Sequence, residues 1–352
     1  MKKETFHLAV RFLAGLALSL LICAGMILTG KLGGNKPLIQ QASGLKGSEV
    51  VMTVDGENVE AWEYLYMTSY TAQSLSYYGI TDLNTALGEG YTAADYVAQQ
   101  AESQVTQQAA IRKWAKDMGV TLTEEDHAAI QEQKDAYGAD LQKVLKLNGL
   151  SEEQYEQLME TSLLYQRLYD AYCAEGGALR PADKDLTALA DEHGLMTADV
   201  LFISTAELDD AAKADAKALM EDYARQLSAA GDKAAAFAAL ETGENVTVLA
   251  SNTYDGCDET TLNTALAALA EGQVSGVIED ENGYYVALRR GIDLNAVAEM
   301  AFGEDMSARI GSAEVTHIDS VYERIDVAAY YTRFSALQQQ VYSQLTASEA
   351  QG

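Results

Sequence analysis

The sequence predicts an α+β protein with a mostly helical part, a small antiparallel sheet with flanking helices, and an apolar segment at the N-terminus. Three observations support this class. An apolar stripe at near-helical spacing runs through residues 94–118. Hydroxyl residues that suit helix N-caps, Thr123 and Ser151, precede two further helical stretches. Farther along, Asn282-Gly283 separates two apolar runs, which is typical of a β-hairpin because both residues tolerate a positive φ.

The charge is strongly negative, with 53 acidic and 24 basic residues and a formal net charge of −29. This argues against nucleic acid as a partner, because affinity for nucleic acid comes mainly from neutralising phosphates. The simplest interpretation of the charge is a well-solvated surface. The four histidines (His7, His127, His193, His317) are scattered, and no His/Cys cluster has metal-ligand spacing. The sequence therefore predicts neither a metal site nor a cofactor.

Residues 1–30 are interpreted as a membrane anchor or signal segment. Lys2, Lys3 and Arg11 precede an apolar run, 12–28, of 17 residues. This length is at the short end of a bilayer span of roughly 17–25 residues. Basic residues on this side place the N-terminus in the cytoplasm and the bulk of the chain outside it.

Two alternatives remain for this segment. A cleaved signal peptide needs a small-x-small site, and residues 28–31 contain no clean one, so an uncleaved single-pass anchor in the cell membrane is preferred. Lipidation of Cys23 needs a small residue before the cysteine, where Ile22 stands. Residues 31–48, rich in Gly, Lys, Ser and Gln, are predicted to be a flexible linker.

Residues 49–193 are expected to form the mostly helical domain. A short strand at 50–54 leads to Asp55-Gly56, and a helix follows around Trp62. Three sequence motifs follow one another in this region. They are the strand with its turn (50–59), the junction between two helices (115–126) and the segment 147–155. In this order they resemble the N-terminal chaperone domain of the SurA and PrsA group.

A second region, 194–291, alternates strands and helices. A strand at 197–204 is followed by helices at 209–229, 233–240 and 260–270, and then by strands at 274–278 and 284–289. This order resembles a parvulin-type peptidyl-prolyl isomerase of the PrsA and SurA group. The resemblance implies a four-stranded sheet lining a groove for extended polypeptide. Residues 292–352 match nothing recognisable; a stripe in 329–345 predicts a helix that packs back on the chaperone domain.

The resemblance also places the candidate cleft. The two family histidines fall on Val200 and Tyr285, and the apolar proline pocket falls near Asp258 and Leu262. Phe202, on the strand of Val200, is the remaining aromatic candidate. The cleft cysteine of the family could correspond to Cys257, which is otherwise a small buried hydrophobe or a disulfide partner of Cys173.

Valine has no hydrogen-bond donor and tyrosine has one hydroxyl, so the resemblance assigns no catalytic residue. We expect a membrane-anchored extracytoplasmic foldase that binds unfolded or exported polypeptides, with isomerase activity weak or lost. Whether the chain is an enzyme stays open. The alternative is a non-enzymatic scaffold or assembly protein with one dedicated partner.

Overall fold

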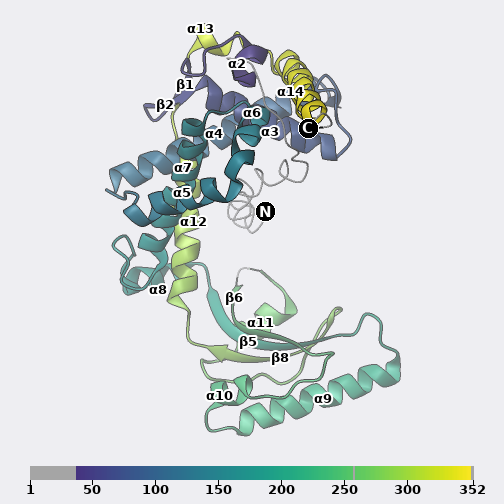
Figure 1. Cartoon of the computed structure of the whole chain (residues 1–352). Coiled ribbons are helices and arrows are strands. Elements are labelled where there is room, and N and C mark those ends of the chain that lie inside the picture. The colour runs from purple at the N-terminus through teal and green to yellow at the C-terminus, as the bar shows by residue number, and fades with distance from the viewer. Residues whose placement is uncertain (1–36, 257, 350–352) are drawn as a thin grey trace. The chain divides into compact units, whose positions relative to one another are not determined.

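The structure is a computed structural model that describes residues 37–256 and 258–349 (Figure 1). It divides into two compact units, one ending at Asp170 and resuming at Gly303, the other running from Ala171 to Phe302. The chain thus crosses from unit to unit within helices α7 (Glu152–Cys173) and α12 (Leu294–Ser312), not at the domain limits 193 and 291 that the sequence predicts.

The first unit is mostly helical, with a three-stranded sheet of order β2-β1-β9 and a two-stranded ribbon β3-β4. Asp55 and Gly56 join β1 to β2 as a two-residue turn, with φ of 49° and 82°. Positive φ at both positions is what such a tight hairpin requires, so the strand and turn predicted here are confirmed. The elements are α2 (Leu38–Ser43), β1 (Val50–Val54), β2 (Glu57–Glu60), α3 (Ala61–Tyr77), β3 (Ala86–Gly88), β4 (Tyr91–Thr92), α4 (Ala93–Asp117), α5 (Glu124–Tyr137), α6 (Leu141–Asn148), β9 (Val315–His317), α13 (Asp319–Tyr322) and α14 (Val327–Glu349).

Both predicted helix caps are present. The Thr123 hydroxyl accepts from the backbone N–H of Asp126 at the start of α5, and Ser151 and Gln154 exchange the equivalent bonds before α7. In α4 the predicted stripe is buried up to residue 115, whereas Met118 is 45% exposed because the helix ends at Asp117. The polar break in that stripe, Gln108, is also buried.

The α5 cap is reinforced by an ion pair with α7. The Arg167 guanidinium donates to both carboxylate oxygens of Asp126 at 2.9 Å, and the backbone N–H of Thr123 donates to Asp126 at 2.8 Å. The hydrogen bonds from Arg167 first, and those from Thr123 after them, hold the pKa of the Asp126 carboxyl at about 2, while burial opposes them. The charged carboxylate thus stabilises the folded state.

Replacing Arg167 by methionine is expected to lower the free energy of unfolding of the first unit at pH 7 by about 1–2 kcal/mol. This range already allows for the partial exposure of Arg167, which weakens the ion pair. The Asp126 carboxylate contributes its full stabilisation above its unfolded-state pKa and loses it as the pH falls through its lower folded-state pKa. The difference in unfolding free energy between variant and wild type should therefore shrink as the pH falls from about 4 to about 2. Urea unfolding at pH 7 and pH 3 can follow Trp62 and Trp114, the two tryptophans, which both lie in this unit. Lys113→Met, which removes an exposed pair with Asp117, is the control. An equal loss at both pH values would contradict the assignment.

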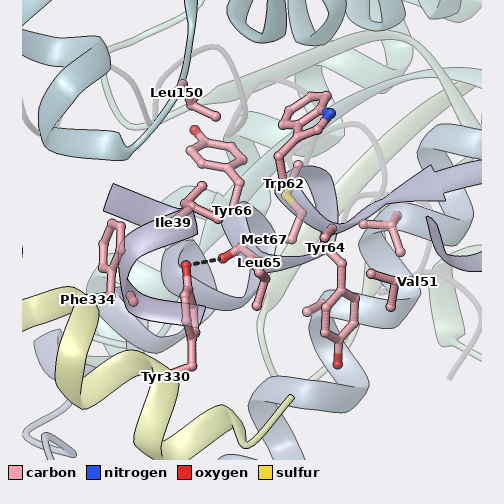
Figure 2. Close-up of a cluster of buried hydrophobic side chains, with 14 of the residues drawn as sticks. Ile39, Val51, Trp62, Tyr64, Leu65, Tyr66, Met67, Leu150, Tyr330 and Phe334 are labelled. Atoms are coloured by element: carbon pink, nitrogen blue, oxygen red, sulfur yellow. Dashed lines mark hydrogen bonds between the residues drawn. The ribbon is translucent and has the colours of Figure 1, made fainter. Parts of the chain in front are cut away.

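The core of the first unit joins the two ends of the described chain. Tyr330 and Phe334 project from α14 toward side chains of α2 and α3, and the Tyr330 hydroxyl donates to the Leu65 carbonyl at 3.1 Å (Figure 2). Both aromatic side chains are 1% exposed. The last helix is therefore part of the core that the first helices build.

The linker prediction is wrong for residues 37–48. They form α2 and the turn after it, and Leu38, Ile39, Ala42 and Leu45 are each at most 3% exposed. The local composition is linker-like, but these four side chains are buried against α14 and other core helices, which gives the segment an ordered structure. Residues 31–36 and the apolar run 12–28 lie outside the described residues. Across 37–256 and 258–349, no helix has the length and apolar character of a membrane span.

The second unit is built on a four-stranded antiparallel sheet of order β6-β5-β8-β7. One face packs on α9 and α10, and the other packs on α11 (Figure 1). The chain thus contains a mostly helical unit and a helix-flanked antiparallel sheet, which confirms the α+β class. The elements are α8 (Asp183–Glu192), β5 (Leu195–Ser204), α9 (Asp210–Ala229), α10 (Lys233–Ala238), β6 (Thr247–Asp255), α11 (Thr261–Ala267), β7 (Ile278–Glu279) and β8 (Gly283–Arg290).

The hairpin at the end of this sheet differs from its prediction. Only Ile278 and Glu279 form a strand, because the Ser275 hydroxyl accepts from the Ala287 N–H at 2.8 Å where a backbone carbonyl would otherwise bond. Asn282 has a negative φ, and the turn is held by the Asp280 carboxylate, which accepts from two backbone N–H groups. Gly283 is needed for close approach, since a Cβ there would lie 2.0 Å from the Ile203 carbonyl oxygen.

Candidate functional site in the second unit

The two central strands place the main candidate residues on one face of the sheet. Val200 of β5 lies opposite Ala287 of β8, and Phe202 lies opposite Tyr285. Residues directly opposite in an antiparallel pair, and residues two apart on one strand, share a face. The rings of Phe202 and Tyr285 stack with centroids 4.6 Å apart, while Val200 is fully buried.

Helix α11 covers this face and contributes Leu262. Val200 lies in one apolar cluster with α11 residues, and Leu262 and Tyr285 pack against that cluster. Asp258 is elsewhere: it is exposed in the turn before α11, where its backbone carbonyl accepts from the Asn263 side chain at 3.2 Å. The structure thus brings together Val200, Phe202, Leu262 and Tyr285 and leaves Asp258 in a capping turn. Cys257 lies outside the described residues.

Comparison with known protein families decides what this unit is. A PPIC-type PPIase domain matches residues 187–294, which include β5, β8 and the whole sheet. The second unit is a parvulin-type domain. The resemblance drawn from the sequence is thereby confirmed for this part of the chain.

The chain also matches solved structures of PrsA and SurA-like proteins. They include a peptidylprolyl isomerase PrsA from Bacillus anthracis (15% identity, 68% of this chain, 96% of that chain, TM-score 0.25). A foldase protein PrsA from Streptococcus pneumoniae has 18% identity over 74% of this chain and 99% of that chain, with a TM-score of 0.26. A SurA-like chaperone from Campylobacter jejuni has 12% identity over 76% of this chain and 98% of that chain, with a TM-score of 0.21. Similarities this distant support no argument about function. No curated protein matches the chain.

The apolar cluster on the parvulin-type face supplies packing and the hydroxyls of two tyrosines. Burial, and then the nearby Asp280 carboxylate, raise the pKa of the Tyr285 phenol, so this hydroxyl stays protonated. Tyr254 of β6 packs against the same cluster, and burial raises its pKa as well. Every other described member of this cluster is aliphatic. The buried part of this face is therefore apolar, while Phe202, Leu262 and Tyr285 are only part-buried.

The sequence reasoning missed Asp199, the neighbour of Val200. Its carboxylate accepts from the Arg290 guanidinium at 2.7 Å and from the Ser251 backbone N–H at 2.7 Å. The second bond satisfies a β-bulge in β6, where Ser251 has a φ of 52° and the register shifts. An acid inside an apolar strand is the signal that could have indicated it, because such residues are rarely buried unless they are paired.

Metal chemistry has no evident site in the parts of the chain that the structure describes. Within residues 37–256 and 258–349, no group of three or more His, Cys, Asp or Glu side chains is arranged to hold an ion.

Proposed function

We propose that this protein is a membrane-anchored, extracytoplasmic foldase that holds unfolded or exported polypeptides, and that its parvulin-type domain isomerises prolyl bonds weakly or not at all. The observation that carries the proposal is the pair Val200 and Tyr285, which stands on the central strands where the family resemblance puts two histidines. The anchor is assigned to residues 12–28 on their sequence alone.

The chemistry explains why this pair matters. Prolyl isomerisation breaks no covalent bond, and its uncatalysed barrier of about 18–20 kcal/mol comes from amide conjugation. A site lowers the barrier by removing water from the amide and by binding the twisted state more tightly than the planar one. Val200 can only contribute apolar surface. The Tyr285 hydroxyl interacts with Asp280, so little polar stabilisation remains for a twisted amide.

The part-exposed side chains of this face, Phe202, Leu262 and Tyr285, suit polypeptide binding. An apolar and aromatic face gains free energy from burying any extended chain with hydrophobic side chains, without a strict requirement for proline. Weak and unselective contact of this kind is what holding an unfolded client requires.

Two assays on the soluble part of the chain, residues 37–352, test the proposal together. Against a proline tetrapeptide, turnover is expected to be at least about 100-fold below that of an active parvulin, a loss of the size seen when a key donor is removed. In parallel, the protein should suppress the aggregation of several unrelated unfolded proteins. Turnover equal to that of an active parvulin would refute the catalytic half, and failure to suppress any aggregation would refute the holding half.

The alternative function is a scaffold for one fixed partner. It predicts no general suppression of aggregation and co-purification of a single protein in stoichiometric amount. Among the described residues the apolar face is compatible with either role, so the aggregation assay separates them.

A further inference from the structure

Strand β6 is a long and exposed edge of the parvulin-type sheet. It pairs only with β5, and among the described residues no strand lies on its other side. From Thr247 to Thr253 every residue is exposed except Leu249, which is half-buried, and none is charged or proline. Exposed edges are usually blunted by charges or prolines, because their free N–H and C=O groups invite another strand.

The register shows which backbone groups of β6 face outward. In an antiparallel pair, residues alternate between bonding the partner strand and pointing away from it. Gly256 donates its N–H to the Gly194 carbonyl at 3.0 Å, so this pair is a hydrogen-bonded one. Because bonded and non-bonded pairs alternate, the backbone N–H and C=O of Thr253, three residues earlier, point away from β5. On the other side of the bulge, Val248 lies opposite Leu201, whose backbone groups bond β8 and not β6. The backbone N–H and C=O of Val248 therefore also point away from β5.

We propose that this edge binds an extended segment of an unfolded polypeptide as an added strand, and that the segment is favoured when it carries basic residues. The inference deepens the proposed holding function and rests on it. Main-chain bonds to an edge strand supply affinity with little dependence on sequence, which suits clients of many kinds.

Charge favours a basic polypeptide over a second copy of this chain. Residues 171–302 contain 24 acidic and 8 basic side chains. Glu241 and Glu244 precede β6, and Asp255, Asp258 and Glu259 end or follow it. An antiparallel pair of two β6 strands would bring the acidic start of each next to the acidic end of the other, which is destabilising. Lysine or arginine flanking a client strand would instead meet opposite charge.

The bulge at Ser251 keeps the pairing short. It divides the edge into Thr247–Leu249 and Asn252–Asp255, and Asp199 fixes it in place. Bulges twist an edge and interrupt continuous pairing. The edge therefore offers a few main-chain bonds, enough for reversible capture and too few to template a fibre.

The test uses three capped peptides of alternating valine and threonine. One has two lysines at each end, one has two glutamates at each end, and the third repeats the lysine peptide with every second backbone nitrogen methylated. Binding to residues 37–352 is measured by fluorescence anisotropy at low salt. The variants are Val248→Pro and Thr253→Pro, which delete outward N–H donors without breaking the β5 ladder, with Val248→Ala and Thr253→Ala as controls that keep those donors.

The lysine peptide should bind, and each proline should weaken it by about 3–10-fold, as expected for the loss of one backbone hydrogen bond. The alanine controls should bind within about twofold of the wild type. The glutamate and N-methylated peptides should bind at least about tenfold more weakly. The N-methylated peptide tests the wild type directly, so the result stands even if a proline variant fails to fold.

Three outcomes would overturn the inference. Equal binding of the methylated and unmethylated peptides would show that main-chain pairing is not involved. Self-association that Val248→Pro abolishes would make a second copy the occupant. Absence of binding by the wild type would also reject the edge, and if aggregation suppression persisted, the proposed function would stand without it. Binding through β6 with no suppression of aggregation would instead reject the holding function alone.

Discussion

Replacing Arg290 by methionine is expected to destabilise the parvulin-type domain by about 3–5 kcal/mol, among the largest effects of any single substitution in this chain. The Asp199 side chain is only 4% exposed, and Arg290 is its charged partner at 2.7 Å. Methionine keeps the apolar stem of the arginine but leaves the carboxylate buried without compensation. The domain contains neither tryptophan, so hydrogen exchange of the β5 and β8 amides is the measurement.

A double mutant identifies the cause. Asp199→Asn in the Arg290→Met background removes the buried charge, and its side-chain oxygen can still accept from the Ser251 N–H, so most of the lost protection should return. Arg225→Met, which removes an exposed pair with Asp222, is the matched control and should change stability by less than about 0.5 kcal/mol. If Arg290→Met behaved like Arg225→Met, the pair would not stabilise the sheet.

Phe334→Ala is expected to destabilise the first unit by about 3–5 kcal/mol. The ring is 1% exposed in the core that α14 shares with α2 and α3, and its centroid lies 5.9 Å from that of Tyr330 (Figure 2). Truncation removes the transfer free energy of the ring and leaves a cavity that closely packed neighbours fill only in part.

Tryptophan fluorescence during urea unfolding reports this effect, because Trp62 and Trp114 both belong to the first unit. Gln339→Ala, on an exposed position of the same helix, should stay within about 0.5 kcal/mol of the wild type. A small effect of Phe334→Ala would contradict the role of this ring in the core of the first unit.

The elements that the sequence predicted well are those with strong local signals. Asp55-Gly56 has the composition of a two-residue hairpin, and Thr123 and Ser151 sit three residues before the partners of their capping boxes. The strands around Val200 and Tyr285 followed from an apolar run and from the family resemblance. Their shared face could then be inferred, since the register of a sheet is determined by which side chains are buried.

The predictions that failed depended on partners distant in the sequence. Residues 37–48 have the composition of a linker, and their burial comes from a helix almost three hundred residues later. At Ser275, a hydroxyl bonds where the backbone of a strand was expected. Asp199 stood out only as an acid inside an apolar strand, and its partners could not be predicted because Arg290 and the β6 bulge are brought to it only by the folded sheet.

The sequence by itself determined the secondary structure of most segments, the acidic character of the body and the absence of both family histidines, because these depend on residue identity and short-range spacing. Tertiary structure alone decided which helix completes the first core, which arginine neutralises the buried carboxylate and which strand forms the open edge. Each of these depends on contacts between residues far apart in the chain, and their free energy exists only once the intervening chain has been ordered.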